Sequence, residues 1–359
     1  MKRILVVGAG GSPSTNFVRS LRKAKEKFYI VGMDVDKYNL VRAETDKKYI
    51  SPPASDPSYI KFINLIVANE RIDFIHAQNE AELKALSDNR EKINAKMFLP
   101  SKKTIKICFN KFLSYQAWKK TDIKIPKTML INNPADLKKA LRKFKGQLWL
   151  RSISGAGGKG ALAIKNNEFD TAKAWIDFND GWKKFTAAEL LTPESITWMS
   201  IWKDGELIVA QGRKRLYWEL SRVSPSGITG ITGGSLTVND KNLDELAIKT
   251  IKAIDQKPHG LYGVDLTYDN QGVINPTEIN AGRFFTTHYF FTELGLNMPY
   301  IFVKLAFDEK IPKIGRKLNP LKTGMLWIRG VDFKPILSSE NVIDQFTTTY
   351  NNNLKSLKK

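Results

Sequence analysis

The sequence is poor in cysteine, with Cys108 alone among 359 residues. A disulfide within the chain and a metal site built from cysteines are therefore both excluded. A lone cysteine also favours a reducing, cytoplasmic setting. Long apolar runs are missing as well, since no stretch approaches the roughly 20 apolar residues that span a bilayer. We therefore expect no membrane partner.

Acidic residues are scarce beside basic ones: 36 Asp and Glu face 57 Lys and Arg, which gives a formal net charge of +21. Such a charge is compatible with nucleic acid, a membrane surface or anionic small molecules as partners. The one sharp basic cluster is Arg213-Lys214-Arg215, and there is no basic tail. Nucleic-acid proteins usually concentrate their charge, so we expect most lysines to lie on a solvated face.

The N-terminal third alternates short apolar runs with helical patterns, which predicts a parallel α/β unit. The glycine turn Gly8–Gly11, with Asp34 downstream, imitates a dinucleotide-binding fingerprint. However, Pro13 stands where the third glycine of that fingerprint belongs, which argues against NAD binding. The expected strands are residues 4–8, 29–35 and 74–76, and the expected later helices are 59–68 and 80–86.

Beyond residue 110 the pattern changes to hairpins separated by helices, which predicts an α+β region. Asn133-Pro134 is a typical helix start. Expected helices are 112–118, 171–178, 243–254 and 299–307, and expected strands are 148–151, 161–164, 185–191, 196–202, 207–209, 261–268 and 273–280.

A glycine-rich loop follows the strand that ends at Arg151: Ser154-Gly155-Ala156-Gly157-Gly158-Lys159-Gly160. Glycines free the backbone to present N–H groups, and a lysine adds positive charge, so such a loop suits phosphates. A mobile surface hairpin is the alternative interpretation.

The hairpin near residue 270 carries three hard oxygen ligands. If Asp269–Gly272 form its loop and Tyr268 pairs with Val273, then Asp265 faces Pro276. Glu278 and Asn280 then share the face of Asp265, as Mg²⁺ binding beside phosphates requires. Three polar residues on a solvent face are the alternative, which the apolar surroundings weaken.

The segment from Glu189 to Glu194 reads as a strand that leaves a core and ends in a carboxylate. Its backbone, around Leu191, can read an adenine edge, and Glu194 can hydrogen-bond ribose hydroxyls. Surface glutamates are common, so this signal is weak alone. The three histidines show no metal-ligand spacing and are expected to be structural.

Together these residues resemble the ATP-grasp superfamily, in particular one ATP-binding half of the large subunit of carbamoyl-phosphate synthase, over residues 1–310. The resemblance implies a nucleotide site. Asn110-Lys111 would lie where the chain enters the grasp domain, and Lys111 would contact ATP. One extra residue precedes Arg283 relative to the family pattern. The implied roles are phosphate binding by Arg151, Gly157, Gly158 and Lys159, an interdomain hinge at Glu189–Leu191, ribose binding by Glu194, metal binding by Asp265, Glu278 and Asn280, and phosphoryl contact by Arg283.

The implied fold class is α/β and α+β: an ATP-grasp fold behind an N-terminal Rossmann-like domain. The expected divisions are a pre-ATP-grasp domain at 1–108, grasp subdomains at 109–190 and 191–332, and a polar C-terminal tail at 333–359. We expect Asn351–Lys359 to be frayed.

The implied activity is that of an ATP-dependent carboxylate–amine ligase that forms an acyl phosphate and releases ADP and phosphate. Its cofactors would be ATP and Mg²⁺, two ions or Mn²⁺ in their place, and a homodimer is compatible with the sequence. Arg213 and Arg215 can hold the substrate carboxylate, although a solvated basic turn explains them equally well. A complete carbamoyl-phosphate synthase is not expected, since only one grasp unit is present.

Three alternatives stay open: a catalytically idle ATP-binding module, a Rossmann NAD(P)-binding oxidoreductase, and a nucleic-acid-binding protein. The sequence does not name the carboxylate or the acceptor.

Overall fold

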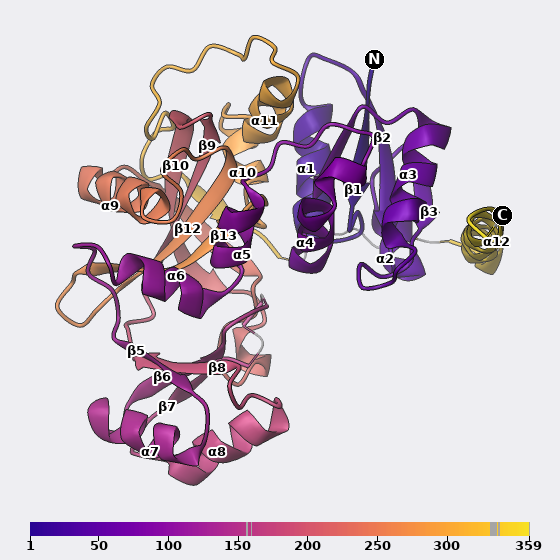
Figure 1. Cartoon of the computed structure of the whole chain (residues 1–359). Helices are drawn as coiled ribbons and strands as arrows, with labels where there is room; N and C mark the ends of the chain where they lie inside the picture. Colours follow the sequence, from indigo (N-terminus) through magenta and orange to yellow (C-terminus); the bar gives the residue numbers. More distant parts are fainter. Residues whose placement is uncertain (156, 159, 331–335, 337, 359) are drawn as a thin grey trace.

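Three sheets follow one another along the chain. The computed structural model describes residues 1–155, 157–158, 160–330, 336 and 338–358. A four-stranded sheet comes first, a second four-stranded sheet follows, and a six-stranded sheet comes last. In Figure 1 the first sheet lies on the right, while the six-stranded sheet lies above the second four-stranded sheet on the left.

The first sheet is parallel with the order β3-β2-β1-β4, which confirms the predicted α/β unit. Its central strands are apolar and buried, as parallel strands covered on both faces require. The strands are β1 (Lys2–Val7), β2 (Phe28–Asp34), β3 (Lys47–Ile50) and β4 (Phe74–Ala77), and the helices are α1 (Ser12–Arg22), α2 (Lys37–Arg42), α3 (Tyr59–Glu70) and α4 (Glu80–Asp88), with a 3₁₀ turn at Arg90–Lys92.

Two helices lead out of the first unit, α5 (Lys102–Cys108) and α6 (Lys111–Trp118). Asn110 caps α6, because its side chain accepts hydrogen bonds from the backbone N–H groups of Phe112 and Leu113. This cap sets Lys111 at the first position of the helix.

The second sheet is antiparallel with the order β5-β8-β6-β7. Helix α7 begins as predicted, with Asn133 accepting from the backbone N–H of Asp136 and with Pro134 in its first turn. The elements are β5 (Thr128–Ile131), α7 (Pro134–Lys143), β6 (Leu148–Ser152), β7 (Leu162–Ile164), α8 (Phe169–Phe178) and β8 (Phe185–Glu189), and Figure 1 shows both helices on one side of the sheet.

The six-stranded sheet is antiparallel with the order β13-β12-β9-β10-β11-β14. Helix α9 packs on one face through a buried cluster that includes Trp198 and Leu266. The elements are β9 (Ser195–Lys203), β10 (Glu206–Trp218), a 3₁₀ turn (Ser221–Val223), β11 (Thr232–Val238), α9 (Lys241–Lys252), β12 (Gly260–Tyr268), β13 (Ile274–Ala281), α10 (Tyr289–Glu293), α11 (Met298–Ala306) and β14 (Leu326–Ile328).

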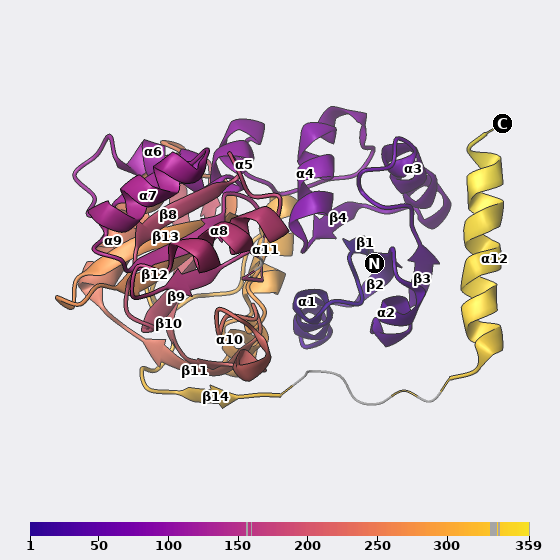
Figure 2. The same cartoon turned by 90° about the horizontal axis from the view of Figure 1, so that it is seen from below.

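Three expectations about this last third are wrong. Strand β10 runs to Trp218 instead of ending at residue 209, and its partners β11 and β14 were not expected. The charges at 213–215 hide the strand, which pairing with β9 and β11 stabilises. The polar tail is not frayed where it is described, since α12 (Glu340–Ser356) is helical and lies beside β3, α2 and α3 (Figure 2).

The first unit packs against the segment that connects β13 to β14. Helix α1 donates from Asn16 Nδ2 to the carbonyl of Thr286 at 2.7 Å, and Ser20 Oγ lies 2.9 Å from Thr292 Oγ1. One apolar cluster joins α1 to α11. None of the described helices is both long and apolar enough to cross a bilayer.

Candidate active site

Lys111, Arg151 and Glu278 come from α6, β6 and β13 and meet at one point. The Nζ of Lys111 lies 3.4 Å from Glu278 Oε1 and donates to the carbonyl of Gly155 at 2.7 Å. The backbone N–H of Lys111 also donates to Ile153, 2.8 Å away. The lysine thus ties α6 both to a carboxylate of the six-stranded sheet and to the glycine-rich loop.

Asp265, Asn280 and Arg283 extend this cluster along β12 and β13. Asn280 Nδ2 donates to Asp265 Oδ2 at 2.9 Å, and the guanidinium of Arg283 donates to Asn280 Oδ1. Thr197 Oγ1 on β9 donates to Asp265 Oδ1 at 2.6 Å. The three predicted oxygen ligands are therefore neighbours, and the extra residue before Arg283 does not keep it from them.

The register that brings the carboxylates together differs from the predicted one. Tyr268 pairs with Ile274, and Asp265 lies directly opposite Glu278. A bulge at Thr277 separates this pair from Pro276, which has no N–H to donate to the ladder. The carbonyl of Thr277, unpaired in the ladder, accepts from Arg151 Nη2 at 2.7 Å.

The charges around Glu278 keep it ionised. Loss of hydration works to raise its pKa, but the nearby cations Lys111, Arg151 and Arg283 lower it below the ordinary value. The Nε atoms of Arg151 and Arg283 are buried without a hydrogen-bond partner among the described residues. Buried donors that lack partners are costly, so these two are placed to receive an anion.

This donor set fits a magnesium–phosphate group. Two carboxylates and an amide supply hard oxygens, and no three His, Cys, Asp or Glu side chains gather into a metal cluster in the described part of the chain. Mg²⁺ is typically held by one or two carboxylates, with phosphate oxygens and water completing its octahedron. Asp265, Glu278 and Asn280 would hold the ion, while Arg151 and Arg283 would face the phosphates.

The glycine-rich loop between β6 and β7 approaches two other parts of the molecule. The N–H of Gly155 lies 3.5 Å from Glu80 Oε1 at the start of α4. Gly157 and Gly158 have φ angles of +73° and +74°, and a methyl group on Gly158 would lie 2.6 Å from the carbonyl oxygen of Ile228. Ala156 and the predicted phosphate ligand Lys159 lie outside the described residues.

Arg213 and Arg215 are not a solvated turn, because they stand inside β10. Arg213 is 1 % exposed, and its guanidinium lies 4.5 Å from the ring of Phe285. The Nη2 of Arg215 lies 3.6 Å from Asp265 Oδ1. Both arginines share the hydroxyl of Thr232, at 3.4 Å and 3.1 Å.

Comparisons with known proteins bear on the fold of the chain. Residues 4–98 match the family model of the PylC-like N-terminal domain. The chain is similar to N5-carboxyaminoimidazole synthetase from Staphylococcus aureus, with a TM-score of 0.65 and 14 % identity over 87 % of this chain and 78 % of that one. Biotin carboxylase from Campylobacter jejuni, solved as a beta-gamma-ATP complex, gives 0.67 and 16 % over 86 % and 72 %. No curated protein sequence matches.

The chain has the ATP-grasp fold. An L-amino acid ligase from Bacillus licheniformis shares it, with a TM-score of 0.64 and 11 % identity over 85 % of this chain and 74 % of that one. Identities this low show the fold alone, so the roles of single residues rest on the geometry of this chain.

In this ATP-grasp chain the predicted adenosine ligands lie apart from the Glu278 cluster. Glu189 Oε2, at the end of β8, accepts from the backbone N–H of Lys127 at 2.8 Å, and Glu194 pairs with Lys214 at 2.7 Å. Leu191 lies between β8 and β9. Within the described residues neither carboxylate pairs with Lys111 or Arg151, so their nucleotide roles stay predictions.

The prediction missed Thr197, Thr232, Phe285 and Arg329. Thr197 links Arg215 to Asp265, and Thr232 links Arg213 to Arg215. Phe285 stacks on Arg213, and Arg329 Nη1 donates to the carbonyl of Thr232 at 3.3 Å. Alternation offered a signal for Thr197, because Ser195 and Thr197 share one face of an apolar strand. Arg329 follows a three-residue strand and gave no local signal.

The acid downstream of the N-terminal glycine turn, Asp34, accepts hydrogen bonds from the backbone of its own unit. Asp34 Oδ2 accepts from the N–H of Gly10 at 3.0 Å, and Asp34 Oδ1 accepts from the N–H of Asp36 at 3.0 Å. In a dinucleotide site the corresponding acid binds a ribose. The structure therefore gives the oxidoreductase alternative no support beyond the sequence pattern.

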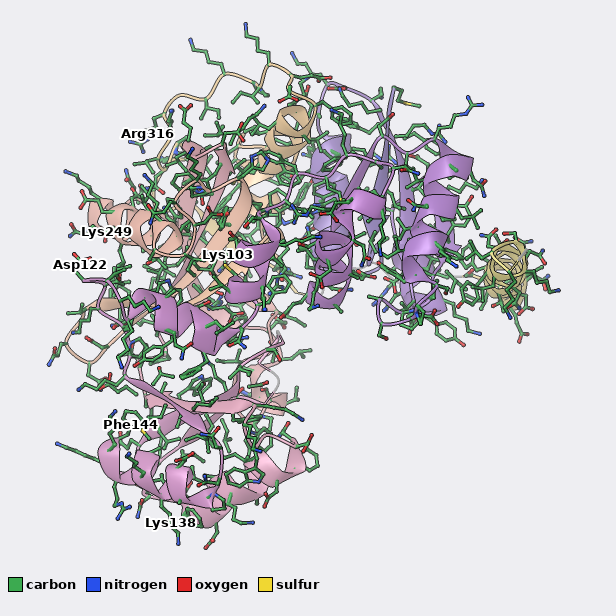
Figure 3. All side chains as sticks on the ribbon, in the orientation of Figure 1. Lys103, Asp122, Lys138, Phe144, Lys249 and Arg316 are labelled. Atoms are coloured by element: carbon green, nitrogen blue, oxygen red, sulfur yellow. The ribbon has the colours of Figure 1, made fainter. Side chains whose placement is uncertain are left out.

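Basic side chains are spread over the molecule. Figure 3 labels Lys103 on α5, Lys138 on α7, Lys249 on α9 and Arg316 in the loop before β14, which belong to separate elements. A nucleic-acid interface is expected to form a stripe or patch, so these positions do not favour that alternative.

Proposed function

We propose that the chain is an ATP-dependent ligase that joins a carboxylate to an amine. The observation that carries the proposal is the meeting of Lys111, Arg151 and Arg283 around Glu278, beside Asp265 and Asn280, with two buried guanidinium Nε atoms unpartnered in the described residues. Catalysis of phosphoryl transfer consists mostly of positioning and charge neutralisation. This cluster supplies both.

The reaction proceeds in two steps. A carboxylate oxygen of the substrate attacks the γ-phosphorus of ATP, and the bond from that phosphorus to the β,γ-bridging oxygen breaks, releasing ADP. The amine then attacks the acyl carbon, the bond to the phosphate breaks, and the amine loses a proton. Mg²⁺, two ions or Mn²⁺ in their place, would neutralise the β- and γ-phosphates when bound.

The residues of this chain position the reactants. Lys111, Arg151 and the loop containing Gly157, Gly158 and Lys159 cover the phosphates and exclude water from the acyl phosphate. Arg283 faces the transferred phosphoryl group. The adenosine part lies along Glu189, Leu191 and Glu194, and Arg213 and Arg215 hold the carboxylate substrate.

The proposal includes the organisation of the chain. We place a pre-ATP-grasp domain at 1–108, grasp subdomains at 109–190 and 191–332 and a terminal segment at 333–359. A homodimer is compatible with the fold, since one structural relative is named as a domain dimer. A cytoplasmic setting rests on the single cysteine, Cys108, which is buried.

The test is a screen for ADP release with purified chain, Mg-ATP and pairs of carboxylates and amines, followed by mass spectrometry of the products. A condensed product formed with one ADP per bond supports the ligase. Binding of Mg-ATP without ADP release for any pair would identify an idle ATP-binding module instead. Failure to bind Mg-ATP would overturn both interpretations.

A further inference from the structure

The face of the six-stranded sheet opposite α9 carries two rows of polar side chains. Paired positions in neighbouring antiparallel strands point to the same side. One row joins Glu278, Asp265, Thr197, Arg213 and Thr237, and the next joins Thr267, Ser195, Arg215, Ser235 and Trp327.

The charge changes sign along these rows. Acids stand at β12 and β13, while arginines stand at β10. At the β11–β14 end the row finishes with a hydroxyl and an indole N–H. Neighbouring strands are about 4.8 Å apart, so Arg213 starts about 10 Å from Asp265, and Trp327 starts about 19 Å from it.

We call Arg213 and Arg215 on β10, together with Ser235 and Trp327 beyond them, the arginine end of the rows. Several hydrogen-bond donors at this end have no acceptor in the described part of the chain. The Nε and Nη1 of Arg213, the hydroxyl of Ser235 and the Nε1 of Trp327 are all buried and have no hydrogen-bond partner among the described residues. Arg213 is 1 % exposed and Ser235 0 %. Unpaired N–H groups on a buried guanidinium are expensive, so this end is incomplete without an oxyanion.

Three arginines gather around one threonine at this end of the rows. Arg213, Arg215 and Arg329 all contact Thr232. Asp265 is the one carboxylate paired with Arg213 or Arg215 in the described part of the chain, and it pairs with Arg215. Burial, and then the charge of Arg215, lower the pKa of Arg213 well below its ordinary value.

Arg213 and Arg215 share Thr232 and differ in their other contacts. The guanidinium of Arg215 lies against the ring of Trp218 and reaches back to Asp265, where the phosphoryl group would be transferred. The guanidinium of Arg213 lies against the ring of Phe285 and donates to Thr232, and it pairs with no carboxylate among the described residues. A single carboxylate held for attack on ATP would satisfy Arg215 and leave Arg213 unpaired.

We propose that Arg213, Ser235 and Trp327 form a second oxyanion site, so that the substrate carries an anionic group besides the carboxylate that is activated. The substrate class is therefore a dicarboxylate or a phosphorylated carboxylate. This inference rests on the proposed ligase function, which assigns the carboxylate substrate to Arg213 and Arg215. Within that pair, Arg215 holds the carboxylate that is activated and Arg213 holds the second anionic group.

The test measures binding of small anions to the full chain in the presence of Mg-ADP by isothermal titration calorimetry. The probes are succinate and glutarate, with two carboxylates, phosphoglycolate, with one carboxylate and one phosphate, and butyrate, with one carboxylate. We expect at least one dianion to bind about tenfold or more tightly than butyrate. Comparison of succinate with phosphoglycolate identifies the second group as carboxylate or phosphate.

Variants locate the second site. Arg213→Met is expected to reduce the advantage of the dianion over butyrate about tenfold, and Trp327→Phe, which keeps the ring and removes the N–H, about threefold. Arg142→Met, at an exposed arginine on α7, is the matched control and is expected to keep the full advantage. Thermal unfolding checks that each variant is folded, and Trp327→Phe with Ser235→Ala replaces Arg213→Met if the latter unfolds.

Three results would overturn the inference: equal binding of butyrate and the dianions, no dianion binding by the wild-type chain, or a dianion advantage that the variants retain. Failure of the proposed function gives a different pattern. In that case Mg-ADP does not bind, while the dianion advantage and its dependence on Arg213 persist without nucleotide.

Discussion

The chain contains two glycine-rich turns, residues 8–11 and 155–160, and they differ in what completes their hydrogen bonds. The N–H of Gly10 donates to the carboxylate of Asp34 within the same unit. In the second turn the carbonyl of Gly155 accepts from Lys111, which also pairs with Glu278 on another sheet. The first turn is completed locally, whereas the second is tied to a cationic cluster.

This difference shows that glycine content alone does not identify a phosphate loop. The carboxylate of Asp34, at the end of β2, occupies the Gly10 N–H that an anion at the first turn would need. The second turn, by contrast, is surrounded by cations. The Nε atoms of two of them, Arg151 and Arg283, have no hydrogen-bond partner among the described residues. Changes in the first turn should therefore alter stability, and changes around the second should alter ATP turnover.

The largest expected effect is on ATP turnover in Glu278→Ala. Removing this carboxylate takes away the proposed metal ligand and the partner of Lys111, so we expect ADP release to fall by at least about 10²-fold while the fold persists. ADP release and thermal unfolding measure the two effects. Glu245→Ala, at an exposed glutamate of α9, is the control. Full turnover by Glu278→Ala would remove the metal assignment.

The next effect is on stability, in Gly10→Ala. A methyl group there would lie 2.3 Å from the backbone carbonyl oxygen of Asn39, so we expect the free energy of unfolding to fall by about 3 kcal/mol. At Gly11 the nearest atom would be 3.6 Å away, and Gly11→Ala should cost less than about 1 kcal/mol. Urea unfolding compares the two, and equal losses would contradict the tight packing of this turn.

A smaller effect concerns the second turn, in Gly158→Ala. Its methyl group would meet the carbonyl oxygen of Ile228 at 2.6 Å, whereas at Gly157 the nearest atom would be 3.9 Å away. Both glycines have positive φ, so backbone strain is matched. We expect KM for ATP to rise about tenfold more in Gly158→Ala than in Gly157→Ala. If both variants bind ATP as the wild type does, the loop does not cover the phosphates.

Many of the features compared above could be predicted from the sequence. Alternating apolar runs predicted the parallel unit, and glycines between two short strands predicted the hairpin after Arg151. The residues Asp265, Glu278 and Asn280 were predicted to converge, and they do so through a bulge that the simple register omitted. Pro276 was the available signal, because it cannot donate to the ladder.

The burial of the arginine end within the sheet could not be predicted from the sequence. Charged residues at 213–215 look like a solvated turn when only neighbours in sequence are considered. They are stabilised within β10 by rings distant along the chain, such as Phe285, and by strands β11 and β14. Such contacts between remote segments leave no local periodicity.

The smallest expected effect is a pH dependence of the folding stability, which arises beside the first turn. Glu82 is 3 % exposed beside Gly8, where a methyl group would lie 2.7 Å from its Oε2. Burial, and then the charge of Asp34, raise the pKa of Glu82 from 4.5 to about 8. The protonated carboxyl therefore contributes stability that is fully present below pH 4.5 and is lost as the pH rises through about 8.

Glu82→Gln replaces this acid with a neutral side chain of the same shape that can still accept the hydrogen bond from Asn79 Nδ2. We expect the wild-type chain to lose about 2 kcal/mol more than the variant between about pH 5 and pH 8. Urea unfolding across this range measures the difference, with Glu168→Gln at an exposed position as control. Parallel stability curves would show that Glu82 is ionised in the folded chain, and the first turn would then hold two negative charges that only a bound cation or donor could offset.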